Sequence, residues 1–179
     1  VDVLPSKDWF NKLRETKPIT NYDNALNYFL INRSAYSGIM KLPNWGFHEK
    51  KSVQPIKWPQ RLDKAHKKLH KNVLLTSNHF RDIIDRPSNN KVWMFIDPPY
   101  FAADQKRAYL KYFNLNDHLE LAELLKNTNH KFCLTYDNCN EIKELYKWAN
   151  IYEIEWMYHT ANSKVTSRKK GKELIITNY

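Results

Sequence analysis

The stretch that most constrains the fold is residues 92–100, Val-Trp-Met-Phe-Ile-Asp-Pro-Pro-Tyr. Its first five residues are apolar on both faces, which is typical of a central strand in a parallel sheet covered on both sides. Prolines cannot continue a hydrogen-bonded ladder, so the strand must stop at the aspartate. We therefore expect the last four residues at the carboxyl end of a central strand, where open α/β sheets bind ligands. These four residues are Asp97, Pro98, Pro99 and Tyr100.

Strand and helix patterns alternate through the second half of the chain. Residues 73–77, 92–97 and 130–136 are predicted as strands, with helices beginning near Arg81, at Asn116 and at Asn138 or Asn140. Such alternation predicts βαβ units and a parallel sheet. Residues 151–158 and 173–179 are then expected to form an antiparallel pair at the edge of that sheet.

The first half of the chain shows two helical patterns around a segment without periodicity. Residues 23–36 are predicted as a helix that Asp23 caps and Gly38 ends, and residues 60–71 as a second helix. Between them, residues 41–59 combine prolines and tryptophans with lysines. Lysines interleaved with aromatic rings suit a loop or hairpin on a nucleic-acid backbone, and the alternative is an ordinary surface loop. The residues concerned are Trp45, Trp58, Lys41, Lys50, Lys51 and Lys57.

The charge balance points to a polyanionic partner. The sequence has 29 Lys and Arg against 19 Asp and Glu, a formal net charge of +10. Such a balance suits DNA, RNA or an anionic surface. No apolar stretch approaches the roughly 20 residues of a membrane helix, and no leader pattern is visible, so we expect a cytoplasmic protein and no membrane partner.

Neither a metal site nor a disulfide is expected. His66 and His70 are four residues apart on a predicted helix, but lysines flank them and no acidic residue accompanies them. Cys133 and Cys139 lie in or beside a predicted strand, where packing is the expected role.

The Asp-Pro-Pro-Tyr tetrapeptide can hold a planar amine. Asp97 offers a carboxylate acceptor, the Pro98 carbonyl is aimed by its rigid ring, and Tyr100 offers a flat face for stacking. An adenine or cytosine amino group that donates both hydrogens there would have its nitrogen lone pair aimed at an electrophile. A base in a duplex would first have to be flipped out, which costs a few kcal/mol.

Several segments of the chain, in the same order along the sequence, resemble those of the Dam-type DNA adenine methyltransferases. These enzymes transfer a methyl group from S-adenosylmethionine to the adenine amino group. Residues 97–100 are similar to the catalytic motif of that family, and residues 30–38, Leu-Ile-Asn-Arg-Ser-Ala-Tyr-Ser-Gly, to the segment leading into its recognition hairpin. Residues 76–80 fall where the family has a strand end beside the cofactor adenine. Residues 167–170 with 173–176 resemble its closing basic loop and last strand.

The resemblance implies roles for individual residues. Asp97 and the Pro98 carbonyl would bind the target amino group, and Tyr100 would stack on the flipped base. Asp97 would also lie near the methyl donor. Pro99 completes the catalytic motif, and Phe80 would border the cofactor adenine.

Further residues are implied at the edges of the site. Asn78 and His79 would lie beside Phe80 at the cofactor. Tyr36 would contact the DNA base stack at the position that the flipped base has left. The remaining residues would contact DNA, and they are Arg33, Ser37, Lys41, Lys50, Ser167, Arg168, Lys169 and Lys170.

The sequence departs from the family pattern in its recognition segment. Ser37 stands where the family has asparagine, and Lys41 where it has arginine. Lysine cannot copy the bidentate guanine contact of arginine. Of the glycine-phenylalanine-asparagine-proline pattern, Gly46-Phe47 is the only trace. The target DNA sequence therefore stays open.

A second departure concerns the cofactor. The family has a phenylalanine-x-glycine-x-glycine loop near its start, and none of the three glycines, Gly38, Gly46 and Gly171, lies in such a loop. We expect a fragment, a split protein whose front segment is a separate partner chain, or a degenerate copy. Cofactor binding by these residues alone is then expected to be weak or absent.

Together these observations predict an α/β protein with a Rossmann-like methyltransferase sheet, incomplete at its N-terminal side. Residues 1–72 are expected to be an inserted helical DNA-recognition region with a hairpin or loop at 39–59, and residues 73–179 the catalytic core. The expected function is adenine-N6 methylation of double-stranded DNA, in a system with a cognate restriction enzyme. The alternatives are N4-cytosine methylation, or a non-catalytic DNA-binding remnant.

Overall fold

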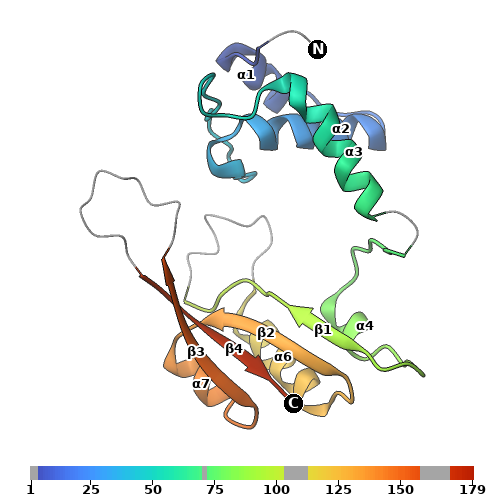
Figure 1. Cartoon of the computed structure of the whole chain (residues 1–179), viewed down its shortest axis with the longest axis vertical. Coiled ribbons are helices and arrows are strands. Elements are labelled where there is room, and N and C mark those ends of the chain that lie inside the picture. Colours follow the sequence, from blue (N-terminus) through green and yellow to red (C-terminus); the bar gives the residue numbers. More distant parts are fainter. Residues whose placement is uncertain (1–3, 70–71, 103–112, 158–169) are drawn as a thin grey trace. The chain divides into compact units, whose positions relative to one another are not determined.

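The computed structural model describes residues 4–69, 72–102, 113–157 and 170–179 (Figure 1). The chain divides into two compact units. The first unit comprises Val1–Thr76 with Arg107–Leu110, and the second comprises Ser77–Lys106 with Lys111–Tyr179.

The first unit is helical, and its first two helices begin at the hydroxyl caps Ser6 and Thr20. Thr20 caps the second helix by accepting a hydrogen bond from the Asp23 amide (3.1 Å), so the expected cap at Asp23 was wrong. The hydroxyl of Thr20 in turn donates to the Asp23 carboxylate (2.7 Å), so both side chains stabilise this helix start. The elements are α1 (Lys7–Glu15), α2 (Asn21–Ser34), the 3₁₀ turns η1 (Tyr36–Gly38) and η2 (Pro55–Lys57), and α3 (Trp58–Leu69).

Aromatic rings form the interior of the first unit. Trp58 is buried and packs edge-on against Phe29 (ring centroids 5.9 Å apart) and Phe47 (6.5 Å). Trp45 packs in the same way against the buried Phe10 (5.7 Å). Trp58 is therefore a core residue, because burying its large ring removes apolar area from water. Trp45 is half-buried, and the nucleic-acid contact of residues 41–59 stays a prediction.

The second unit holds a four-stranded sheet in the order β1-β2-β4-β3. The β1–β2 pair is parallel, whereas β4 is antiparallel to both β2 and β3. The predicted antiparallel pair at the sheet edge is thus confirmed. The strands are β1 (Trp93–Ile96), β2 (Lys131–Asp137), β3 (Asn150–Met157) and β4 (Lys170–Thr177), and the helices are α4 (Phe80–Ile84), α6 (Leu115–Asn127) and α7 (Asn140–Leu145).

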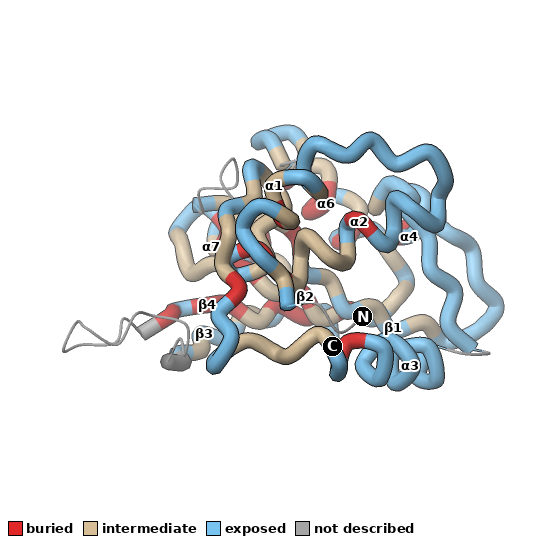
Figure 2. Tube along the Cα trace, turned by 90° about the horizontal axis from the view of Figure 1, so that it is seen from above, coloured by how far each residue is buried: buried red, intermediate tan, exposed pale blue. Residues whose placement is uncertain are grey.

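The core of the second unit lies between one face of the sheet and its helices. Alternate residues of β2, namely Phe132, Leu134 and Tyr136, are fully buried against α6 and α7. The buried positions, red in Figure 2, include residues of β2, β4 and α6. β2 and β4 are therefore the two inner strands of the described sheet, and β1 pairs with β2 at one edge. Among the described residues, no helix is long and apolar enough to cross a membrane.

Two predictions about strands were wrong. Within the described residues β1 is an edge strand, not a central one, and its side chains Trp93 and Phe95 are 54% and 61% exposed. Residues 73–77 form no strand, and Leu74 and Leu75 are 77% and 73% exposed. A run of apolar residues becomes a strand only where a neighbour takes up its backbone hydrogen bonds, and the described residues supply none to 73–77.

Candidate functional site

The tetrapeptide follows β1 directly, as the prolines predicted. The strand ends at Ile96, Asp97 is exposed, Pro98 is buried, and Pro99 and Tyr100 are half-buried. Because β1 and β2 are parallel, their carboxyl ends lie at the same edge of the sheet. The tetrapeptide therefore lies beside the polar end of β2.

Thr135 of β2 orients the Asp97 carboxylate. Its hydroxyl donates a hydrogen bond to Asp97 Oδ1 over 2.8 Å. The carbonyl of Ile96, at 3.4 Å, lies at the limit of a second bond to the same hydroxyl. In the described part of the chain, this leaves Asp97 Oδ2 available to accept a hydrogen bond from a ligand.

Glu173 of β4 holds the Tyr100 side chain. The Tyr100 hydroxyl donates to Glu173 Oε2 over 2.8 Å, and Glu173 is only 4% exposed. Burial and the neighbouring Glu173 carboxylate raise the pKa of Tyr100 well above its ordinary value. Tyr100 therefore stays protonated at neutral pH and keeps donating to Glu173.

Asp137, the last residue of β2, holds the backbone that follows the tetrapeptide. Its Oδ1 accepts from the Phe101 amide (2.8 Å) and its Oδ2 from the Ala102 amide (2.6 Å). Charge-assisted hydrogen bonds of this kind are stronger than neutral ones. The chain is therefore anchored immediately after Tyr100.

Thr135, Asp137 and Glu173 were not among the residues predicted for the site. A signal for two of them was present in the sequence. Thr135 and Asp137 are two residues apart at the end of a predicted strand, so they point to the same face, and both are polar. Glu173 carried no such signal, because its place beside Asp137 depends on the β2–β4 register.

A cavity of about 460 Å³ opens beside Asp97. Phe80 of α4, expected at the cofactor adenine, lines it together with Asp97, and the Phe80 and Phe113 rings lie 5.3 Å apart. Asn78 and His79 do not line this cavity. Its lining is almost entirely apolar and comprises Phe80, Ile83, Ile84, Met94, Phe95, Ile96, Asp97, Pro98, Phe113 and Leu121.

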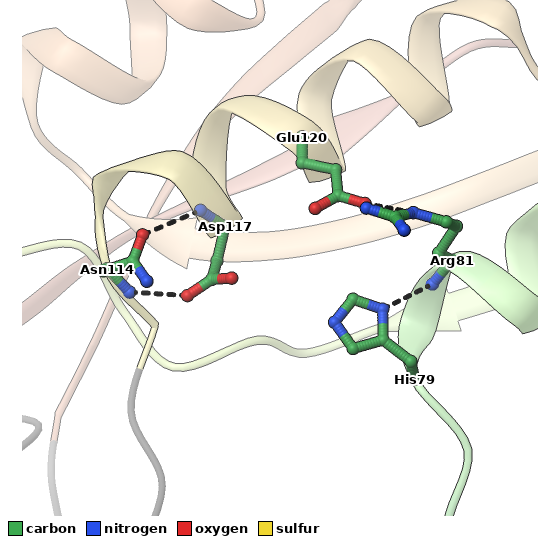
Figure 3. A network of polar contacts seen from close by, with 5 residues as sticks. All are labelled: His79, Arg81, Asn114, Asp117 and Glu120. Carbon is green, nitrogen blue, oxygen red and sulfur yellow. Dashed lines mark hydrogen bonds and ion pairs between the residues drawn. The ribbon is translucent and has the colours of Figure 1, made fainter.

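Polar contacts fix the helices that form the cavity wall (Figure 3). Arg81 of α4 forms an ion pair with Glu120 of α6, which ties the two helices together. His79 caps α4 by accepting from the Arg81 amide (3.4 Å), and its ring stacks on Phe80 with centroids 4.3 Å apart. His79 therefore supports Phe80 from outside the cavity.

The start of α6 is fixed by a capping box. The Asn114 side chain accepts from the Asp117 amide (3.2 Å), while Asp117 Oδ2 accepts from the Asn114 amide (2.8 Å). The expected cap at Asn116 was therefore wrong by two residues. The α7 cap is Cys139, not Asn138 or Asn140.

A buried pair lies beneath the tetrapeptide. His118 Nδ1 and the Tyr136 hydroxyl are 2.6 Å apart, and the two residues are 2% and 0% exposed. The Phe101 ring lies edge-on to His118 (5.1 Å). Burial lowers the pKa of His118, with partial opposition from Asp137 and Asp117, and it raises the pKa of Tyr136.

In the first unit, the segment predicted to contact DNA forms a tight turn after α2. Ser37 and Gly38 have φ of 53° and 67°, in the left-handed region that glycine and asparagine favour. The Asn32 side chain donates to the Gly38 carbonyl (3.0 Å) and closes the turn. Tyr36 projects from it, 56% exposed. The asparagine replaced by Ser37 would have suited this backbone better.

The other residues predicted to bind DNA are placed as follows. Arg33 is half-buried, and its Nε has no hydrogen-bond partner in the described residues. Lys41 is half-buried and Lys50 is exposed. Ser167, Arg168 and Lys169 lie outside the described residues, as does the side chain of Lys170, whose backbone begins β4.

The described residues contain no group of three or more His, Cys, Asp and Glu side chains able to hold a metal ion. His70 lies outside these residues. Cys133 and Cys139 are free thiols, and burial raises the pKa of each.

Comparison with known proteins matches the chain to a family model and to a curated relative. The model of the D12 class N6 adenine-specific DNA methyltransferases matches residues 2–160. The type II methyltransferase M1.LlaDCHI of Lactococcus lactis subsp. cremoris is 32% identical over 94 residues, which cover 49% of this chain and 33% of that protein. The match thus spans about a third of that relative's length.

Proposed function

Because the chain belongs to the D12 class N6 adenine-specific DNA methyltransferase family, we propose that it takes part in methyl transfer from S-adenosylmethionine to the N6 amino group of a flipped-out adenine in double-stranded DNA. The observation that supports this most directly is the position of Asp97. Its carboxylate lies at the carboxyl end of β1, oriented by Thr135 and bordering an apolar cavity.

The cavity beside Asp97 fits part of the cofactor. Its volume of about 460 Å³ and its apolar lining, with Phe80 and Phe113 in contact, suit a flat aromatic ring such as the cofactor adenine. The bound cofactor would supply an electrophilic methyl group on a sulfonium. Phe80 would hold the adenine ring, and Asp97 would lie between the cofactor and the target base.

The target base would be held by the tetrapeptide. The N6 amino group donates to Asp97 Oδ2 and to the Pro98 carbonyl, and these two acceptors direct the nitrogen lone pair toward the methyl group. The Tyr100 ring stacks on the base and excludes water. Catalysis would therefore come from positioning and electrostatics, without a covalent intermediate on the protein.

The partners follow from the same proposal. Double-stranded DNA would be the substrate, with Arg33, Tyr36, Ser37, Lys41 and Lys50 of residues 1–72 as its recognition contacts. The basic segment 167–170 would bind phosphates. The name of the Lactococcus relative, a type II methyltransferase, favours a restriction-modification setting. The second unit, with its parallel β1–β2 pair joined through α6, would be part of a Rossmann-like sheet.

Transfer of a tritiated methyl group from S-adenosylmethionine to unmethylated DNA tests the proposal. Asp97→Ala should reduce the transfer rate by roughly 10²–10³-fold, the usual cost of removing one group that stabilises the transition state. Its DNA affinity should stay near that of the wild type. Asp85→Asn, an exposed carboxylate of the same unit, is the control and should keep full activity.

The outcomes separate the alternatives. Undiminished transfer by Asp97→Ala would refute the role of Asp97. N4-methyl-2′-deoxycytidine instead of N6-methyl-2′-deoxyadenosine in digested DNA would favour N4-cytosine methylation. DNA binding without S-adenosylmethionine binding or transfer would favour a non-catalytic module. A DNA affinity that does not fall with rising salt would argue against phosphate contacts.

A further inference from the structure

Glu173 is a buried carboxylate in an apolar strand. It is 4% exposed, and the next residues of β4 are Leu174, Ile175 and Ile176. A buried carboxylate is costly unless it accepts hydrogen bonds. One donor is the Tyr100 hydroxyl, which reaches it across 73 residues of sequence. Its position therefore links the sheet directly to the tetrapeptide.

The contact restrains the orientation of a ring. The hydroxyl of Tyr100 is held at 2.8 Å by Glu173, and the ring is tilted by 38° against the buried Tyr136, with centroids 6.2 Å apart. Tyr100 has only two rotatable side-chain bonds, so a fixed hydroxyl and a ring contact leave its plane little freedom. The Asp137 anchor at Phe101 holds the adjacent backbone.

The register explains why Glu173 can do this. Glu173 lies directly opposite Asp137 in the β2–β4 ladder, so both side chains project from the same face of the sheet. Two neighbouring carboxylates repel each other unless donors engage them. Here Asp137 takes two backbone amides and Glu173 takes the Tyr100 hydroxyl, so successive residues of one loop satisfy both.

We propose that Glu173 is a positioning residue that sets the plane of the Tyr100 ring for stacking on the target base. The proposal rests on the proposed function for the role of the base, whereas the Glu173–Tyr100 contact stands independently of it. Glu173 would act on the base through the Tyr100 ring, because its carboxylate accepts from the Tyr100 hydroxyl. Loss of the Glu173 carboxylate should therefore weaken stacking of Tyr100 on the base, while every group that contacts the reacting atoms stays in place.

The variants distinguish positioning from general support of the fold. Glu173→Leu removes the acceptor at similar size, and Glu173→Gln keeps an oxygen that can accept from Tyr100. Tyr100→Phe keeps the ring and removes the hydroxyl. Glu144→Leu, at an exposed glutamate of α7, is the control.

The first measurement needs no activity. With 3-fluorotyrosine placed at position 100 of the full chain, Glu173→Leu should move the fluorine NMR signal and lower the pKa of that phenol, because the carboxylate that raises it is gone. Glu173→Gln should change the signal less, and Glu144→Leu should leave it unchanged. Titration with 9-ethyladenine should shift the wild-type signal through stacking, with affinity reduced several-fold or more in Glu173→Leu. An unchanged signal or an unchanged affinity in Glu173→Leu would overturn the proposal.

The second measurement is the steady-state rate of methyl transfer. Glu173→Leu should lower kcat/KM about 10- to 100-fold, the scale of a misplaced positioning group, and Glu173→Gln should restore most of it. Adding Tyr100→Phe to Glu173→Leu should cost little more, because both remove the same contact. Fully additive losses, or wild-type kinetics in Glu173→Leu, would overturn the proposal. If no variant transfers methyl groups while the adenine titration responds as expected, the proposed function fails and the positioning role stands.

Discussion

Replacing Asp137 by asparagine tests how the loop after the tetrapeptide is held. The aspartate accepts one hydrogen bond at each oxygen, from the amides of Phe101 and Ala102. Asparagine keeps one oxygen and presents its amino group to the other amide, so two donors face each other. The backbone geometry and side-chain size are otherwise preserved.

The magnitude follows from the loss of one charge-assisted bond. Hydrogen bonds to charged groups contribute about 1.5–3 kcal/mol. The Ala102 amide is exposed and the Phe101 amide is half-buried, so water can replace part of the lost bond. The lower limit, about 1.5 kcal/mol, is therefore expected, which corresponds to roughly tenfold faster local opening.

Amide hydrogen exchange measures this opening at the two amides themselves. Pro98 and Pro99 have no amide hydrogen, so the readout is confined to Tyr100, Phe101 and Ala102. Exchange at Phe101 and Ala102 should be about ten times faster in Asp137→Asn than in the wild type, and the control Asp85→Asn should match the wild type. Unchanged exchange at both amides would refute the anchoring role of Asp137.

Two further predictions concern stability. Because burial lowers the pKa of His118, the unfolded state binds its proton more readily, so the free energy of unfolding should fall as pH drops below about 6.5, by up to about 1.4 kcal/mol per pH unit. Urea unfolding at several pH values should show this extra slope in the wild type and not in His118→Phe; equal slopes would contradict it. Gly46→Ala should destabilise the first unit by roughly 1–3 kcal/mol, since a Cβ there would overlap the Tyr36 backbone. Near-ultraviolet circular dichroism during thermal unfolding measures it, and an unchanged midpoint would contradict it.

Local chemistry was predictable where a residue's own covalent structure dictates the outcome. Proline has no amide hydrogen, so the end of β1 at Ile96 could be predicted from Pro98 and Pro99 alone. The family resemblance, carried by the same tetrapeptide, is confirmed by the family match. The helices α2 and α3 were predicted from their periodicity, but each begins two residues earlier than predicted, at Asn21 instead of Asp23 and at Trp58 instead of Gln60.

Predictions failed where the answer depended on distant neighbours. The apolar run of β1 is compatible with a central or an edge strand, and pairing placed it at the edge within the described residues. Residues 73–77 were likewise predicted as a strand from an apolar run alone, but no described strand pairs with them. Trp58 could lie on a surface or in a core, and only its packing against Phe29 and Phe47 decided it.

The sequence by itself determined the reacting groups of the proposed site, Asp97 to Tyr100, because their chemistry and the proline stop are properties of consecutive residues. Only the tertiary structure decided what holds those groups. Thr135, Asp137 and Glu173 are 35 to 73 residues away from the groups they bind. They meet them because parallel pairing of β1 with β2, and the β2–β4 register, bring the carboxyl ends of β1 and β2 beside Glu173 in the middle of β4. Register depends on which face of each paired strand the fold buries, so residues 97–100 by themselves do not encode it.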